Sequence, residues 1–267
     1  GKEGKEHVVE SLILKPDTTY DYAASADLPP LASPDTELHR VLRVVESQEW
    51  PEIFHTLNVI RQLALHHQPT LVGSGHLHNL VRIIMKSVDN LRSQLAKNAI
   101  LTVGDLLAGL GRQLDAEVGA IAPGLLKRAT DSSSFIVDAA DAALRLLLQH
   151  ASQHRCLPAL LAHAAHRNPL YRSRVAMCLH CLVLLRGEEL PQCREWDQCK
   201  AALAKLSEDS APITRSYSRE AIRLLLGGGG ASRVEMERVM GADKLEMQMK
   251  YGGDGLAMLG SVGFLPG

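Results

Sequence analysis

Residues 164–185 read AAHRNPLYRSRVAMCLHCLVLL, a short polar loop that opens a helix with arginines first and an unbroken apolar stripe after them. Three further segments have arginine or acidic residues and an apolar stripe in the same order: KSVDNLRSQLAKNAILTVGDLL (86–107), RATDSSSFIVDAADAALRLLL (128–148) and KLSEDSAPITRSYSREAIRLLL (205–226). With Leu91, Ser134, Tyr171 and Ile213 taken as equivalent, the spacings are 43, 37 and 42 residues. A period of about 40 residues with two helices in each is typical of HEAT or armadillo solenoids, which present a row of loops to a partner.

The apolar periodicity predicts five helix pairs between Asp35 and about Leu226. The expected pairs are 36–48 with 52–67, 76–87 with 91–110, 116–129 with 135–149, 155–166 with 170–186, and 195–207 with 212–226. Each later second helix has a polar start signal, namely Asn90, Asp131 with Ser132 to Ser134, Asn168 before Pro169, and Ser210 ahead of Pro212. Segment 232–250 predicts one or two more helices, which gives an all-α HEAT-repeat solenoid of about six helix pairs.

Steps of three and four residues place the apolar side chains of each second helix on one face. On the second pair the expected stripe is Leu91, Leu95, Ala99, Val103, Leu106 and Leu110. On the fourth pair it is Tyr171, Val175, Cys178, Leu179, Leu182 and Leu185. These stripes are expected to form the core.

Composition sets the limits of the domain and of its chemistry. The 267 residues carry a net charge of -1 and are 4% aromatic, which favours helices and argues against a nucleic-acid-binding surface. No apolar run reaches the roughly 18 residues that would span a membrane, and the charged N-terminus is not a signal peptide. The chain has no initiator methionine, so we interpret it as an excerpt of a longer protein. We expect a linker or leader at 1–34, the repeat domain at 35–250 and a flexible glycine-rich tail at 251–267.

The potential catalytic and metal-binding residues have simpler interpretations. Cys178 and Cys181 have a zinc-like spacing, but they lie on a predicted helix, where buried structural thiols are the favoured interpretation. Asp138 and Asp141 are expected on an exposed polar helix face, where a catalytic pKa shift is not expected. The sequence has no nucleophile, phosphate-binding or dinucleotide motif. We therefore expect no enzyme activity, no cofactor and no metal.

Two features point to a binding surface. Trp50 lies in the turn of the first helix pair, where it either packs inward or contacts a partner. Basic residues recur at the starts of the second helices: Lys86, Arg92, Arg167, Arg172, Arg215 and Arg219. In a solenoid these positions align along one edge, and arginine there suits an acidic protein surface because its guanidinium group pairs with carboxylates at two points.

Four stretches of this sequence resemble TOG domains, most closely those of the crescerin family, the TOG array regulators of axonemal microtubules. They are ESQEWPEIFHTLNVIRQLALHH (46–67), VDNLRSQLAKNAILTVGDL (88–106), HRNPLYRSRVA (166–176) and LSEDSAPITRSYSREAIRLLL (206–226). The resemblance covers about 35–250. It implies six HEAT repeats in a flat paddle whose loops within each repeat bind tubulin, with the first repeats on β-tubulin and the later ones on α-tubulin.

The resemblance also implies residue roles. The family's apolar anchor on β-tubulin corresponds to Trp50, and the basic residues of the second, fourth and fifth loops correspond to Arg92, Arg172, and Arg215 with Arg219. The chain departs from the family pattern at Pro51 and Glu52, where a basic residue often follows the anchor. The third loop, 131–135, also lacks a basic residue, and both departures predict weaker capture of tubulin.

The resemblance further implies that the chain is a monomeric module within a longer protein that has several TOG domains. It implies a location in the cytoplasm, on the cytoskeleton and in the cilium. Its partners would be tubulin or microtubules, with no nucleic acid and no membrane. The alternative is a HEAT-type scaffold that has lost tubulin binding and docks another protein, with Trp50 packed inward. On the tubulin-binding interpretation, Arg172→Glu with Arg215→Glu should weaken tubulin binding without lowering the melting temperature.

Overall fold

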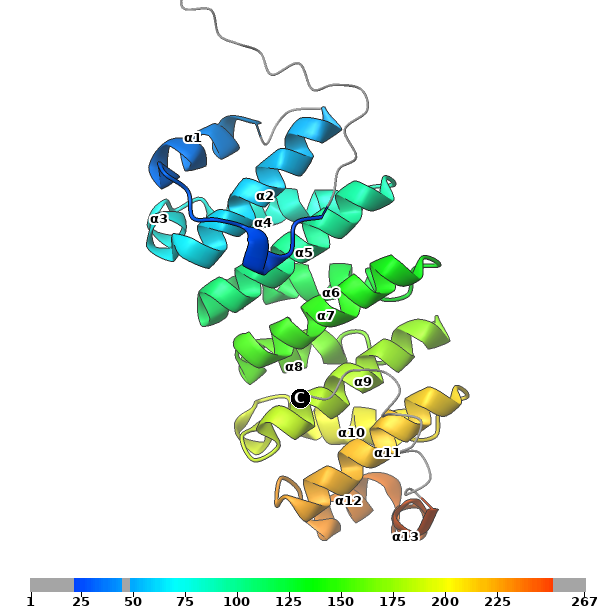
Figure 1. Ribbon diagram of the computed structural model, residues 1–267. Helices are drawn as coiled ribbons and strands as arrows, with labels where there is room; N and C mark the ends of the chain where they lie inside the picture. The colour runs from blue at the N-terminus through cyan, green and yellow to red at the C-terminus, as the bar shows by residue number, and fades with distance from the viewer. Residues whose placement is uncertain (1–21, 45–48, 252–267) are drawn as a thin grey trace, which may run out of the picture.

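The computed structural model describes residues 22–44 and 49–251, which form helices and connecting loops without a strand (Figure 1). The α-helices are α1 (Pro34–Val44), α2 (Trp50–His66), α3 (Gln68–Gly73), α4 (Leu77–Val88), α5 (Ser93–Leu110), α6 (Val118–Arg128), α7 (Ser134–His150), α8 (Gln153–Leu161), α9 (Pro169–Arg186), α10 (Trp196–Leu206), α11 (Pro212–Gly227), α12 (Arg233–Met240) and α13 (Ala242–Tyr251). Three short 3-10 helices are η1 (Ser25–Asp27), η2 (Gly111–Glu117) and η3 (Leu190–Gln192).

The helices stack in two layers. Helices α2, α5, α7, α9 and α11 pack on one another in that order, and α4, α6, α8 and α10 form the second layer behind them (Figure 1). The core lies between the layers, where the apolar stripes of the second helices meet the first helices. Leu95, Ala99, Val175, Cys178 and Leu179 are all buried there. The pairs α1/α2, α4/α5, α6/α7, α8/α9 and α10/α11 match the predicted pairs.

Local sequence explains where the second helices begin. Asn168 caps α9 by accepting a hydrogen bond from the backbone N–H of Leu170, and Pro169 takes the first helical position. Pro212 has the same place in α11. Helix α8 ends at Leu161, five residues short of the predicted 166, because the chain turns through i→i−3 bonds such as His163 N–H to the Leu160 carbonyl.

Two leucines predicted to belong to the apolar stripes do not lie in the core. Leu91 precedes α5 and is 99% exposed, so its spacing from Leu95 does not reflect a shared helix face. Leu185, near the end of α9, is 39% exposed because it faces an open depression where α9 and α11 end. The stripe predictions are wrong at these two positions.

The segment before α1, residues 22–33, packs on helices α2 and α5. Ser25 Oγ donates to Asp105 Oδ1 at 2.6 Å, and Arg61 Nε donates to the other oxygen of the same carboxylate at 2.6 Å. Leu28 is buried, and its carbonyl accepts from His66 Nε2 at 2.7 Å. Residues 22–33 are therefore attached to α2 and α5, while residues 1–21 lie outside the described part.

A final helix pair covers the last repeat. Glycines follow α11, and then Ser232 and Glu235 form a capping box that starts α12. Lys200 Nζ of α10 lies 3.0 Å from Glu235 Oε1, and Gln248 of α13 donates to Ser207 Oγ at 2.5 Å. The predicted segment 232–250 thus contains two helices, and the predicted tail from 252 onward lies outside the described residues.

Candidate functional site: the loop edge

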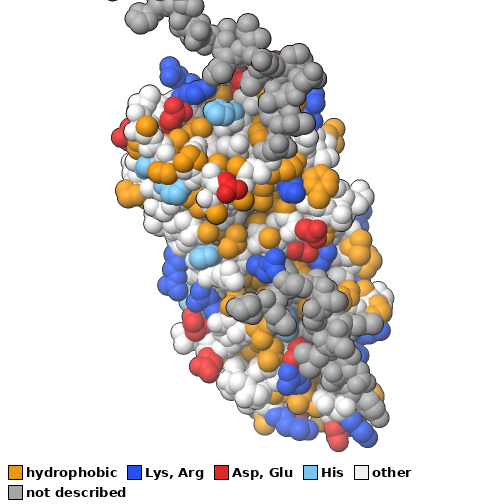
Figure 2. Space-filling model, in the orientation of Figure 1, with side chains coloured by type: hydrophobic (Ala, Val, Ile, Leu, Met, Phe, Trp, Pro, Cys, Tyr) orange, Lys and Arg blue, Asp and Glu red, His pale blue; other side chains and the backbone are white. Residues whose placement is uncertain are grey.

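The loops within the helix pairs lie along one edge of the solenoid, at the right of Figure 1. We call this the loop edge and define it as Trp50 at the start of α2, the loops 89–92, 129–133, 162–168 and 207–211, and the first turn of the helix after each loop. Figure 2 shows apolar and basic side chains interspersed along the same margin. Stacking of the repeats therefore brings positions about 40 residues apart in sequence into one row.

Trp50 and Arg92 are brought together at one end of this edge. Trp50 is half-buried and packs against the core, and the guanidinium carbon of Arg92 lies 5.2 Å from the centroid of its ring. A cation in this position is attracted by the ring face, by about 0.5–1 kcal/mol at an exposed site. Trp50 is therefore neither fully packed inward nor fully exposed, and its contact with a partner stays a prediction.

Arg172 supports two loops rather than extending from the edge. Its guanidinium group forms a two-point pair with Asp209, with Nε 2.6 Å and Nη2 3.1 Å from the carboxylate oxygens. Its Nη1 also donates to the His166 and Arg167 carbonyls at 2.9 and 3.2 Å. The Arg172 hydrogen bonds hold the pKa of Asp209 below its usual range. This arginine joins the α8–α9 loop to the α10–α11 loop.

Arg215 has the same local role one repeat later. Its Nη1 donates to the carbonyls of Asp209 and Ser210 at 2.7 and 2.9 Å, as Arg172 does to the residues five and six positions before it. Arg219 Nε donates to the Ser207 carbonyl at 3.2 Å. These contacts correct the expectation that reversing Arg172 and Arg215 leaves stability unchanged, since both changes remove hydrogen bonds that hold the loops.

Lys86 and Arg167 are exposed, but only Arg167 lies on the loop edge; the prediction that Lys86 lies at the start of a second helix is wrong. Lys86 lies in the last turn of α4, and Arg167 lies in the α8–α9 loop. Together with Arg92, which is also exposed, they form the part of the predicted basic row that is most accessible to a partner. Arg172, Arg215 and Arg219 are each partly buried. The six basic residues therefore separate into an exposed group and a group that supports the loops.

An Asn or Asp side chain fixes each of the four described loops. In every case its Oδ1 accepts from the backbone N–H two residues later, at 2.9–3.0 Å. The four residues are Asn90, Asp131, Asn168 and Asp209. Such turns replace backbone hydrogen bonds that an irregular loop lacks, so these loops are well ordered before any partner arrives.

Three exposed apolar residues at this edge were missed by the sequence reasoning. Leu91 is 99% exposed, Leu170 is 61% exposed and Phe135 is 39% exposed. Each follows a loop-fixing Asn or Asp by one to four residues. For Leu170 the sequence signal was present, because it comes before the stripe that begins at Tyr171, whereas Leu91 was wrongly included in a stripe.

A cleft opens beside these residues between α7, α9 and α11. Its volume is about 360 Å³, and Val137, Leu170 and Ile213 form its apolar side. Arg174 lines the opposite part, where its Nη1 lies 3.1 Å from Asp141 Oδ2. The loop edge therefore carries an apolar depression as well as protruding side chains.

The prediction that Asp141 lies on an exposed helix face is wrong. It is 9% exposed, and burial outweighs the attraction of Arg174 and raises the pKa of Asp141 to about 6. The residue lies in the packing between α7 and α9, and its Oδ1 is buried without a hydrogen-bond partner in the described structure. This carboxyl therefore has no open path to a substrate.

The cysteines are buried, as expected for structural thiols. Burial raises the pKa of Cys156, Cys181 and Cys199 to about 12, which keeps these thiols protonated and weakly nucleophilic. Within the described residues, no three His, Cys, Asp or Glu side chains are placed to hold one metal ion. No helix among them is both long and apolar enough to cross a membrane.

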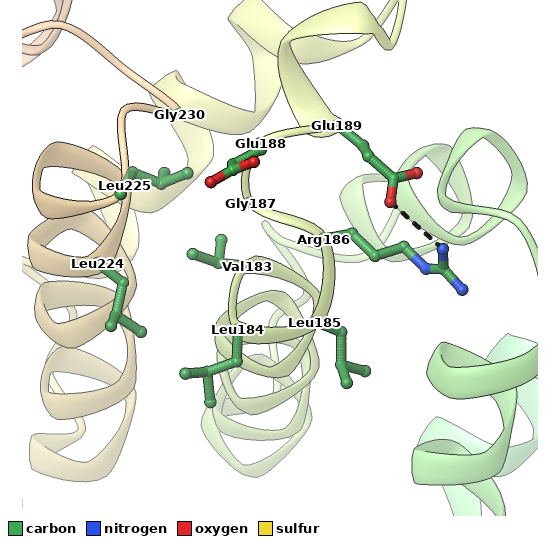
Figure 3. Close-up of a pocket in the computed structure, with 11 residues that line it drawn as sticks. Val183, Leu184, Leu185, Arg186, Gly187, Glu188, Glu189, Leu224, Leu225 and Gly230 are labelled. Atoms are coloured by element: carbon green, nitrogen blue, oxygen red, sulfur yellow. Dashed lines mark ion pairs between the residues drawn. The ribbon is translucent and has the colours of Figure 1, made fainter.

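A second depression lies where α9 and α11 end, away from the loop edge (Figure 3). Leu184 and Leu185 of α9 and Leu224 of α11 line it, and its volume is about 390 Å³. Arg186 and Glu189 form an ion pair at 3.6 Å on its rim. Its lining thus combines apolar side chains with the charged residues Arg186, Glu188 and Glu189.

Comparison with known proteins places the fold. Residues 57–227 match the family described as CLASP N terminal. The chain is 28% identical over 207 residues to TOG array regulator of axonemal microtubules protein 1 of Mus musculus, in an alignment that covers 76% of this chain and 12% of the relative. It is 26% identical over 231 residues to Crescerin-like protein che-12 of Caenorhabditis elegans, covering 85% of this chain and 18% of the relative. The chain thus spans less than a fifth of either relative.

A solved structure gives the same result for the fold. Crescerin, which uses a TOG domain array to regulate microtubules in the primary cilium, has a solved chain that superposes with a TM-score of 0.58. The identity is 18%, and the match covers 82% of this chain and 88% of the other. The predicted all-α HEAT-type solenoid and the predicted TOG resemblance are both confirmed.

Proposed function

This chain belongs to the CLASP N terminal family of TOG-like domains, and from that membership we propose that it is a non-catalytic module that binds tubulin through its loop edge. The observation that carries the proposal is the row of four ordered loops, with Trp50 and Arg92 at one end. Names of relatives that refer to axonemal microtubules support the choice of partner. We extend the proposal to the regulation of ciliary microtubules.

The mechanism is rigid display of a binding surface. The helix pairs set the distance between neighbouring loops, and the Asn and Asp turns set the shape of each loop. Binding then needs little ordering of the protein, so more of the contact energy appears as affinity. In this mechanism Arg172, Arg215 and Arg219 act indirectly, because they hold loop carbonyls in place.

The exposed basic residues contribute attraction and register. Lys86, Arg92 and Arg167 face solvent, so their interaction with an acidic surface is screened by salt over about 8–10 Å at physiological ionic strength. Trp50 supplies apolar contact in a position where Arg92 already shields part of its ring. We therefore propose a salt-sensitive encounter followed by burial of apolar surface.

The relatives are far longer than this chain, so we propose that it works as one module among several. Linked modules bind with an effective concentration set by the linker, and the array then binds more tightly than one domain. Weak binding by a single domain is compatible with such an array. Its place of action would be the cytoskeleton in the cytoplasm and the cilium.

The test is a microtubule co-pelleting titration at low and physiological salt, together with gel filtration with free tubulin. Pelleting that weakens with salt, or a shifted tubulin peak, supports the proposal and identifies which form is bound. A Trp50→Ala, Arg92→Ala double variant should bind more weakly, while Leu184→Ser in the groove of Figure 3 should bind normally. Failure of the unaltered chain to bind in either assay would favour the scaffold alternative, for which that groove is the available docking site.

A further inference from the structure

We propose that the exposed apolar residues Leu91, Phe135 and Leu170, which we call the apolar row, form the main contact of the loop edge with tubulin. This inference rests on the proposed function and names residues that carry it. It assigns the direct contact with tubulin to apolar side chains, whereas Arg172, Arg215 and Arg219 act by holding the loops in place. The three residues belong to three successive helix pairs, α4/α5, α6/α7 and α8/α9.

Exposure alone does not identify a contact surface, because single exposed leucines are common on soluble proteins. The position of these residues is more informative. Each lies at the junction between a loop and the helix after it, on the same edge of the solenoid. Trp50 occupies the corresponding junction at the start of α2. A large apolar residue thus lies within two residues of the start of the second helix in four helix pairs, although its exact position differs between them.

The backbone on both sides of Leu91 is held in place. Asn90 Oδ1 accepts from the Arg92 N–H at 2.9 Å, and the Asn90 carbonyl accepts from Arg128 Nη2 at 2.7 Å. Arg128 also bonds the Val88 carbonyl through Nε at 2.6 Å and Asp131 through Nη1 at 2.9 Å. A large apolar side chain is therefore presented on an ordered loop, and burying it costs little loop entropy.

Leu170 is supported in a similar way. Its own N–H donates to Asn168 Oδ1 at 2.9 Å, and Arg172 holds the loop before it through the His166 and Arg167 carbonyls. Phe135 follows the turn fixed by Asp131, and Lys97 Nζ lies 5.2 Å from the centroid of its ring. A basic side chain thus supports each part of the apolar row: Arg128 and Arg172 hold the loops that carry Leu91 and Leu170, and Lys97 packs on the ring of Phe135.

The cleft between α7, α9 and α11 extends the same surface. Leu170 forms part of its apolar side together with Val137 and Ile213, in a volume of about 360 Å³. A depression of this size accepts an apolar side chain from a partner. The loop edge therefore has both apolar projections and an apolar recess, which is the shape that a protein surface can match and a flat hydrophilic ligand cannot.

Charge indicates the chemistry of the partner surface. The exposed basic residues Arg92 and Arg167 lie within one to three residues of Leu91 and Leu170 in the chain, and so border the apolar row. A matching partner has an apolar patch rimmed by carboxylates, and we assign tubulin to that role. Because apolar burial is not screened by ions, the apolar row should supply the part of the affinity that remains after physiological salt has weakened the contribution of the basic residues.

The test compares two double variants in microtubule co-pelleting at low and physiological salt. Leu91→Ser with Leu170→Ser removes the most exposed part of the apolar row. Leu184→Ser with Leu185→Ser makes the same two chemical changes in the groove of Figure 3, at leucines that are 40% and 39% exposed. We expect the first variant to bind on the order of tenfold to a hundredfold more weakly at both salt concentrations, and the second to bind normally. Thermal unfolding of both variants checks that each remains folded.

Three outcomes would contradict this inference. If the unaltered chain pellets and the Leu91, Leu170 variant pellets equally well, the inference is wrong and the proposed function stands. If the unaltered chain does not bind tubulin in any form, both are wrong. If these leucines instead join two copies of this chain, the unaltered protein elutes as a dimer, the variant elutes as a monomer, and affinity for tubulin does not change.

Discussion

Arg172 connects two neighbouring loops through four hydrogen bonds to the Asp209 carboxylate and to loop carbonyls, so at the residue scale its first effect is on stability. The partner atoms belong to the α8–α9 loop and, 37 residues later in sequence, to the α10–α11 loop. Removing the guanidinium group leaves the Asp209 carboxylate, which is largely buried, without its main partner. An unpaired charge of this kind is costly.

We predict that Arg172→Ala lowers the free energy of unfolding by about 1–3 kcal/mol at neutral pH. The pKa of Asp209 is lower in the folded protein than in the unfolded chain. The Asp209 carboxylate therefore stabilises the fold above its unfolded pKa, and this stabilisation is lost as pH falls through the lower folded pKa. Urea unfolding at pH 7 and at pH 3 measures both effects. Arg167→Ala is the control because that side chain is exposed, and equal stability of the two variants would contradict the supporting role of Arg172.

Asp141 is predicted to destabilise the fold at neutral pH. Burial raises its pKa from 3.8 to about 6, so between these values the folded state binds more protons than the unfolded state. The free energy of unfolding therefore falls as pH rises through this window, by about 2–3 kcal/mol in total. Asp141→Asn should abolish this fall and raise stability at pH 7.

Chemical unfolding between pH 4 and pH 7 measures the difference. Asp138→Asn is the control on the exposed side of the same helix; the Asp138 charge raises the pKa of Asp141 much less than burial does, so this change should reduce the pH dependence only slightly. If Asp141→Asn lowers stability at pH 7, the ion pair with Arg174 at 3.1 Å outweighs the cost of burial, and the predicted sign is wrong.

At the scale of elements, α2 and α5 pack closely at a glycine. A Cβ atom added to Gly109 of α5 would lie 2.1 Å from the Ala64 carbonyl oxygen of α2, a distance that requires the helix backbones to separate. Glycine thus allows the second helices of the first two pairs to pack closely. The direction of the row of loops depends on this packing.

We predict that Gly109→Ala lowers the free energy of unfolding by about 1–3 kcal/mol or more. Gly119→Ala in α6 is the matched control, because nothing lies within 4 Å of an added Cβ there. In that helix, alanine should be neutral or stabilise by up to about 1 kcal/mol. Thermal and urea unfolding of both variants test this, and an unchanged Gly109→Ala protein would show that α2 and α5 can shift apart freely.

The segment before α1 is a further element whose packing should contribute to stability. We predict that removing residues 1–31 lowers the free energy of unfolding by about 1–3 kcal/mol, because Leu28 leaves a buried site and Asp105 loses its bond from Ser25. Comparison of the shortened and complete chains by urea unfolding measures the effect. Equal stability would mean that this segment is a linker, as the sequence interpretation of 1–34 allows.

At the scale of the whole molecule, the sequence predicted the helix pairs well and the roles of individual side chains less well. Helix starts are encoded locally by pairs such as Asn168 and Pro169, so they could be read directly. The partners of Arg172 and Arg174 lie 37 and 45 residues away, which a helical period does not reveal. Leu91 was assigned to the core because it is four residues before Leu95, although α5 begins after it.

The candidate site follows from the stacking of the repeats. Each loop is fixed locally, and the solenoid places four loops and Trp50 on one edge. The sequence located this edge and its basic residues. It did not distinguish exposed basic residues from those that hold loop carbonyls, because that difference depends on which carbonyls the folded chain brings near.

Hydrogen–deuterium exchange of the chain with and without saturating microtubules or tubulin tests the central claim most directly. We predict slower exchange in the bound state at residues 89–93, 131–135, 166–171 and 207–213, with residues 183–189 and 224–230 unchanged. Protection confined to the groove of α9 and α11, with the loop edge unchanged, would contradict the proposal that the loop edge binds tubulin.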